Sequence, residues 1–203
     1  MDLPREYPRM IRSFVHRLPA LALRQVRRFG PARNGVVAVE FGLVALPFVG
    51  LLAAITETAL AFFAAQMLDA TVSDAARQIY TGQFQNSLKS NSPALSADET
   101  LKKFRKLVCT GRVTIFDCDK LKIDILPVSN DDSFKPKSPI DAQNKTWRKD
   151  FGTNYTKPEA SQIVLVQAAV EFPVFFSAMN PMTLTNGMRV LQTTVAFRTE
   201  PYQ

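Results

Sequence analysis

Glu40 is the residue whose chemistry needs most explanation in this 203-residue chain, because it stands at the start of a long apolar run. No charged residue follows it from Phe41 to Thr56, and the apolar character resumes after Glu57 as far as Ala65. An unpaired carboxylate at the end of a membrane span costs several kcal/mol, so we expect a function and a partner for it.

Cleavage of the chain between Gly35 and Val36 would create a partner, because it leaves a free α-ammonium group close to Glu40 in the sequence. In a bundle of such helices, the ammonium group of one subunit would pair with Glu40 of its neighbour. The pair would neutralise both charges and set the axial register between subunits. The alternative is an uncut anchor helix whose Glu40 carboxylate reaches the aqueous interface.

Other residue types offer little catalytic chemistry. The one histidine, His16, lies in the N-terminal arm, so no Ser/His/Asp or Cys/His set is expected in the rest of the chain. Asp117 and Asp119 are close in sequence, but no convergent set of groups is evident around them. We therefore expect no enzyme activity, no cofactor and no metal site. The basic cluster at 102–106 is accompanied by acidic residues and indicates a solvated helix face rather than a nucleic-acid site.

The positive charge is concentrated in the N-terminal arm. Residues 1–35 carry eight arginines against two carboxylates, a net charge of +6, whereas the remainder carries 17 basic and 16 acidic residues. The positive-inside rule then places the arm in the cytoplasm. This pattern predicts a basic cytoplasmic leader (1–35), one transmembrane helix (36–65) in lipid of the inner membrane, and a periplasmic or extracellular domain (66–203).

The apolar helix is expected to continue beyond the membrane as far as about residue 82. A helical stripe follows the span, and Gly82 is a suitable terminator. Helical residues 36–81 would extend roughly 70 Å. Pro47 lacks an amide hydrogen, so a kink is expected there. The stripe consists of Leu68, Val72, Ala75, Ala76 and Ile79.

A short helix should follow. Ser96 and Glu99 form a capping-box pattern, and the helix should end near Cys109 with Gly111 as its C-cap. Cys109 and Cys118 are the only cysteines, and an oxidising compartment favours a disulfide between them over two buried thiols.

The remaining segments favour strands. Val113 and Ile115 hint at one strand, and 121–125 alternates with Lys122 and Asp124 on the polar side. A long loop or series of turns is expected over 129–160. Segments 161–176, ended by Pro173, and 188–201 should pair as antiparallel strands against the amphipathic half of the long helix. The predicted fold class is α+β: a long N-terminal helix, a small antiparallel sheet, a short helix and one disulfide.

The sequence resembles the TadE-like family, the minor pseudopilins of the tight-adherence pilus system. The resemblance lies in the opening "GVVAVEFGLVALP", the mid-helix carboxylate Glu57, the "DAARQIYTGQ" stretch at 74–83 and the ending "FRTEP". It implies that Gly35 precedes a cleavage site, that Val36 is the mature N-terminus, and that Glu40 and Phe41 serve recognition and assembly.

The family resemblance also implies partners and a role. A prepilin peptidase, other pilins or pseudopilins, inner-membrane platform proteins and lipid would be partners, with no nucleic acid. The role would be structural, in pilus biogenesis, adhesion and surface colonisation, with the subunit in the inner membrane and, after assembly, in the surface pilus. The alternatives are an uncut inner-membrane scaffold, an anchored sensor or binding domain, and a tethered hydrolase.

Overall fold

The computed structural model describes residues 35–89, 95–128, 136–176 and 183–201. The chain divides into two compact units, Met1–Leu52 and Ala53–Gln203. Helix α2 (Val36–Tyr80) contains the boundary between them. Residues 1–34 of the predicted leader lie outside the described residues, and the domain limits inferred from the sequence stay predictions.

Helix α2 has the length and the apolar composition needed to cross a membrane, and none of its most apolar window is buried. Its first half exposes apolar side chains in every direction, whereas burial starts at Ala61 and then follows one face. This change confirms the predicted amphipathic second half. The helix continues through Pro47, and the kink expected there stays a prediction. The buried stripe consists of Ala61, Ala64, Leu68, Thr71, Val72, Ala75, Ala76 and Ile79.

The turn after α2 uses Gly82, whose φ of 74° lies in the left-handed region that glycine adopts readily. A second helix, α3 (Gln83–Lys89), follows directly. The sequence analysis did not predict this helix. Phe84 supplies the apolar anchor of this short helix by packing edge-on against Phe104, with ring centroids 5.3 Å apart.

Helix α4 (Ala97–Cys109) begins with the predicted capping box. Ser96 Oγ accepts from the Glu99 backbone N–H at 3.3 Å, and Glu99 Oε2 accepts from the Ser96 N–H at 2.9 Å. The C-cap residue is Thr110 rather than Gly111, which follows it with φ of 74°. Leu101, Phe104 and Val108 point from α4 into the core.

The predicted disulfide between Cys109 and Cys118 is present and joins the end of α4 to the short 3₁₀ helix η2 (Cys118–Lys120). The strand predicted at Val113 and Ile115 is not formed. The chain there is an irregular connection within the disulfide loop, and the Val113 side chain is exposed rather than paired with a neighbouring strand.

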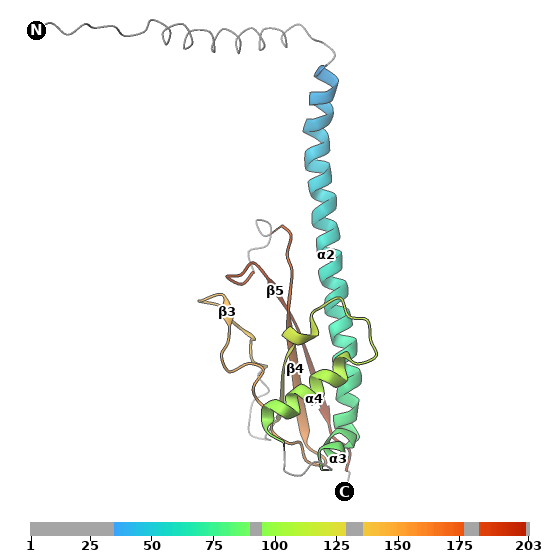
Figure 1. The fold of residues 1–203 in the computed structure, drawn as a ribbon, viewed down its shortest axis with the longest axis vertical. Helices are drawn as coiled ribbons and strands as arrows, with labels where there is room; N and C mark the ends of the chain where they lie inside the picture. Colours follow the sequence, from blue (N-terminus) through green and yellow to red (C-terminus); the bar gives the residue numbers. More distant parts are fainter. Residues whose placement is uncertain (1–34, 90–94, 129–135, 177–182, 202–203) are drawn as a thin grey trace, which may run out of the picture. The chain divides into compact units, whose positions relative to one another are not determined.

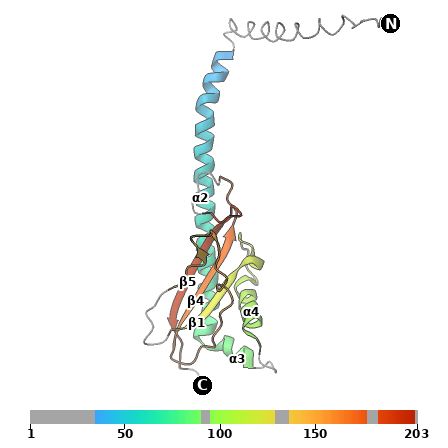
Figure 2. The ribbon, with the colours of Figure 1, turned by 90° about the vertical axis from the view of Figure 1, so that its left-hand side faces the viewer.

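Three strands form the main sheet: β1 (Lys122–Pro127), β4 (Ile163–Phe172) and β5 (Arg189–Arg198). Their order is β1-β4-β5, and both pairings are antiparallel, as Figure 2 shows. Strand β4 ends immediately before Pro173, as predicted. The region predicted as a loop also contains a two-residue hairpin, β2 (Ile140–Asp141) with β3 (Thr146–Trp147).

The sheet packs one face against the second half of α2 and against α4 (Figures 1 and 2). Alternate residues of β4 enter this core, because side chains of a strand point to opposite faces in turn. They are Val164, Val166, Ala168, Val170 and Phe172. A polar contact adds to the packing, since Thr193 Oγ1 of β5 donates a hydrogen bond to Asp69 of α2.

A substitution at Leu68 tests whether the packing of α2 against the sheet stabilises the domain. Leu68 is fully buried on α2, so Leu68→Ala should lower the free energy of unfolding by about 2 to 5 kcal/mol. Val113→Ala, at a side chain 87% exposed, is the control and should change it by less than about 0.5 kcal/mol. Urea unfolding of the full chain in detergent, followed by Trp147 fluorescence, measures both. Equal effects would mean that the helix does not support the sheet.

Candidate functional site

The segment predicted to be processed lies at the N-terminal end of α2. Gly35 precedes the helix, Val36 is its first residue, and Glu40 follows within the first two turns. Glu40 and Phe41 are exposed. Among the ion pairs of the described residues, none includes Glu40. A cationic partner for this carboxylate would therefore have to come from elsewhere.

The second carboxylate of α2, Glu57, has a partner within the same compact unit. Its Oε2 accepts a hydrogen bond of 2.9 Å from the backbone N–H of Phe176, which follows strand β4. Glu57 lies four residues before Ala61 and so belongs to the helix face that packs on the sheet. The contact joins two segments 119 residues apart. Sequence reasoning identified Glu57 but not this partner, because no local pattern reveals so distant a contact.

Residues 136–155 cover the opposite face of the sheet. Three strand side chains hold this segment by hydrogen bonds: Gln167, Glu171 and Asp124. Gln167 of β4 exchanges two hydrogen bonds of 3.1 Å with the backbone N–H and C=O of Lys137. Glu171 of β4 accepts from the Trp147 indole N–H. Lys122 of β1 places its ammonium 4.5 Å from the centre of the Trp147 ring, a cation–π contact.

Asp124 is the third side chain that binds this segment, and its burial differs from the prediction made from the sequence. The alternation of β1 predicted a polar, outward position, but Asp124 is 1% exposed. It does lie on the face opposite the core, where the segment 150–154 covers it. Its Oδ1 accepts from the backbone N–H groups of Gly152 and Asn154 at 3.0 and 2.8 Å, and from the Asn154 amide at 3.2 Å.

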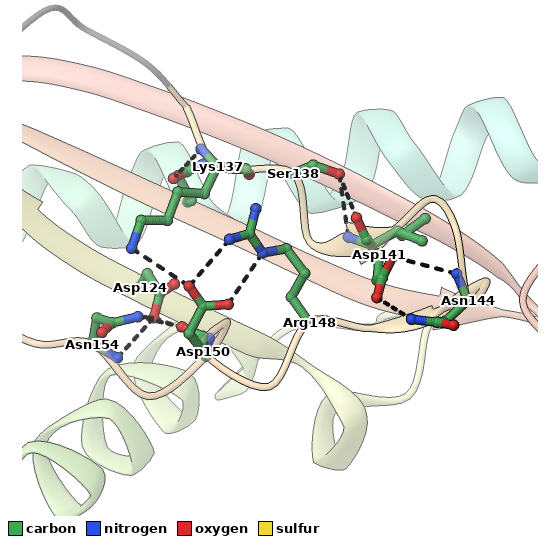
Figure 3. Close-up of polar contacts among 11 residues, drawn as sticks. Asp124, Lys137, Ser138, Asp141, Asn144, Arg148, Asp150 and Asn154 are labelled. Atoms are coloured by element: carbon green, nitrogen blue, oxygen red, sulfur yellow. Dashed lines mark hydrogen bonds and ion pairs between the residues drawn. The ribbon is translucent and has the colours of Figure 1, made fainter.

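An exposed polar cluster continues this covering segment (Figure 3). Asp150 lies between Lys137 and Arg148 and pairs with both, at 3.7 and 3.1 Å. The Arg148 hydrogen bond is the main cause that lowers the pKa of Asp150 below its ordinary 3.8. The Asn144 side-chain amide, followed by backbone N–H groups, likewise lowers the pKa of Asp141. These contacts shape the loop.

The acidic residues Asp117 and Asp119 take part in a local turn. Asp117 caps η2 by accepting from the Asp119 backbone N–H at 3.0 Å, so this acidic pair forms a local turn. Within the part of the chain that the structure describes, no group of three or more His, Cys, Asp or Glu residues could hold a metal ion. The functional candidates that the sequence predicted on α2 are its exposed apolar surface and two of its carboxylates, Glu40 and Glu57.

Comparison with known proteins agrees with this emphasis on the helix. Residues 35–77 match the family model described as TadE-like protein, which confirms the resemblance over that segment. The match begins at Gly35, includes Glu40 and Glu57, and ends at Arg77. No curated protein and no solved structure matches the chain.

The pKa shifts of the polar cluster can be tested separately. Asn144→Ala should return the pKa of Asp141 toward 3.8 while the pKa of Asp150 stays lowered, because Arg148 is untouched. Carboxyl carbon chemical shifts measured against pH report both residues in one sample. Because both folded pKa values lie below the ordinary value, the stabilisation of the loop is present at neutral pH. It is lost as the pH falls below 3.8. An unchanged Asp141 titration in the variant would contradict this assignment.

Proposed function

We propose that this chain, whose residues 35–77 are TadE-like, is a minor pseudopilin: a non-enzymatic structural subunit of a Tad (type IVb, Flp) pilus. The TadE-like family is a structural, pilus-related family of membrane proteins. The observation that carries the proposal is the match to that family over the segment that contains Gly35, Glu40 and most of α2. The role would lie in pilus biogenesis and, through it, in adhesion and surface colonisation.

The position of the helix start supports processing by a prepilin peptidase. The Gly35–Val36 bond lies at the N-terminal end of α2. It is not covered by other described residues, since Val36 is half exposed and Gly35 is exposed. A cut there leaves α2 as the first element of the mature chain. Its new α-ammonium group would pair with Glu40 of a neighbouring pilin or pseudopilin.

The exposed apolar surface of α2 supports a subunit that moves from membrane lipid into a helical assembly. An apolar helix that is exposed on all sides requires lipid or other apolar helices around it. Gly42 and Gly50 have no neighbouring atoms where a side chain would project, so a second helix could approach closely there. Inner-membrane lipid would cover this surface before assembly, and pilin helices or platform proteins would cover it afterwards.

The expected orientation places the basic leader in the cytoplasm and the sheet domain in the periplasm. The disulfide between Cys109 and Cys118 supports that side of the membrane, because disulfides persist in oxidising compartments. An uncut scaffold of the secretion machine would have the same orientation, and the state of the N-terminus distinguishes the two roles.

The intact mass and N-terminal sequence of the protein from native membranes and from sheared surface material test the processing. We expect a chain that begins at Val36 and lacks the first 35 residues. Gly35→Leu should leave the leader attached, because a bulky side chain would then precede the cut. A wild-type chain that still begins at Met1 in both fractions would favour the uncut scaffold and contradict the proposal.

The pairing of Glu40 predicts a selective assembly defect. Glu40→Gln removes the charge at nearly constant volume, so export and membrane insertion should persist while pilus assembly falls. Glu57→Gln is the matched control on the same helix, since its amide oxygen can still accept from Phe176. Pili are counted by electron microscopy, and the protein is quantified in membranes. Normal piliation of the Glu40 variant would rule out the pairing.

A further inference from the structure

We propose that the residues after β4, Val174–Phe176, form a membrane-contacting tip whose aromatic side chains lie in the lipid interface, and that Glu57 positions this tip. The inference rests on the membrane insertion of α2 that forms part of the proposed function. It does not depend on cleavage or on a pilus.

The tip is apolar and open. Phe175 is 73% exposed and Phe176 is 41% exposed, and no charged residue occurs from Phe172 to Phe176. Two adjacent exposed phenylalanines form a surface that water solvates poorly. The neighbouring stretch of α2 presents further exposed apolar side chains, Leu60, Phe62 and Phe63.

The hydrogen bond between Glu57 and the Phe176 N–H fixes where the tip lies along the helix. Glu57 is 17 residues after Glu40, which corresponds to about 25 Å of helix at 1.5 Å per residue. The hydrocarbon core is about 30 Å thick, so a helix that enters near Glu40 leaves it about one turn after Glu57. The contact therefore holds the tip at the level where lipid headgroups and acyl chains meet.

The two ends of the sheet differ in the way that a membrane would require. At the far end, near Tyr80, the strands are flanked by Glu159, Arg198 and Glu200. The backbone N–H of Glu200 donates a hydrogen bond to the backbone C=O of Tyr80. At the tip end, the residues from Phe172 to Phe176 are uncharged. Charged residues adjoin them: Glu171 pairs with Lys120 at 4.0 Å. Arg189, opposite Phe172 in the register, adds a cation where lipid phosphates would lie.

Lipid is the occupant that these observations favour. The tip is hydrogen-bonded to a stretch of α2 that exposes apolar side chains within the same compact unit, and these side chains would contact lipid when the helix is inserted. Phenylalanine is one of the apolar side chains that interfacial segments bury at the boundary between headgroups and acyl chains.

Depth-dependent fluorescence quenching tests the placement. The full chain is reconstituted in vesicles of phosphatidylcholine and phosphatidylglycerol that carry bromine either near the glycerol end or near the middle of the acyl chains. Trp147, the one tryptophan of the chain, is first replaced by Phe so that a single new tryptophan reports its position. Phe175→Trp reports the tip, and Leu46→Trp reports the span.

Val113→Trp is the matched control within the same compact unit. Val113 follows Arg112, which pairs with Asp74 at 2.8 Å. Asp74 is 17 residues beyond Glu57, or about 25 Å further along the helix, so this exposed apolar position should lie clear of the bilayer. A general attraction of exposed apolar side chains to vesicles would quench both reporters.

The proposal expects Phe175→Trp to lose emission, and more with the shallow bromines than with the deep ones, while Val113→Trp keeps its emission. Leu46→Trp should be quenched most by the deep bromines. If Leu46→Trp is quenched and Phe175→Trp is not, the tip placement is wrong although the span is inserted. If Leu46→Trp is not quenched either, membrane insertion itself fails, and the proposed function fails with it.

The positioning role of Glu57 is tested in the Phe175→Trp background. Glu57→Leu removes the acceptor for the Phe176 N–H, whereas Glu57→Gln keeps an amide oxygen in nearly the same place. Shallow quenching should decrease in the Leu variant and persist in the Gln variant. If shallow quenching stays at the level of the Phe175→Trp parent in both variants, Glu57 does not hold the tip. If shallow quenching decreases in both variants, the effect comes from the charge of Glu57 and not from its hydrogen bond.

Discussion

The packing of one face of α2 against the sheet is the contact on which the rest of the domain depends. A sheet with an apolar face must bury that face against another element, and α2 provides the longest continuous cover for it. The stripe begins with small residues, Ala61 and Ala64, and reaches larger ones at Leu68 and Ile79. One helix thus meets two requirements in succession: an apolar surface all round over its first half, and a single apolar face over its second.

The second face of the sheet is closed by a different kind of interaction. Strand β4 is buried on both faces from Val164 to Val170, yet only one face meets a helix. On the other face, the segment 136–155 has little regular structure and is held by side chains that bind its backbone. Gln167 pairs with Lys137 much as a strand residue would pair with its neighbour. Asp124 satisfies three N–H groups through Oδ1, although its Oδ2 is buried without a hydrogen-bond partner among the described residues.

This difference explains what could be predicted from the sequence. The long helix, the capping box at Ser96, the disulfide and the strands β4 and β5 all depend on local periodicity, a short motif or a single pair of cysteines. The helix α3 and the hairpin β2–β3 are too short to give a periodic signal, and they form because of contacts made elsewhere, such as that of Phe84 with Phe104. The burial of Asp124 could not be predicted either, because it also depends on contacts with a distant segment. Its strand shows the right alternation, and only the folded segment 150–154 removes it from water. Glu40 and Glu57 could be identified as functional candidates, but their partners could not be read from spacing.

Glu40 and Glu57 of α2 carry the same chemical group, but their polar requirements are met in different ways, and this difference bears on assembly. Glu57 accepts a backbone N–H within its own chain, so its polar requirement is partly met as soon as the domain folds. Glu40 has no ion-pair partner among the described residues, and a carboxylate near the membrane boundary is costly until it is paired. If the partner is the α-ammonium group of a neighbouring subunit, that cost is relieved only by association. A single subunit would then be fully folded in its sheet domain yet remain unsatisfied at the start of its helix. The favourable free energy of pairing Glu40 would be reserved for the step that brings helices together, without any need for the sheet domain to change its fold.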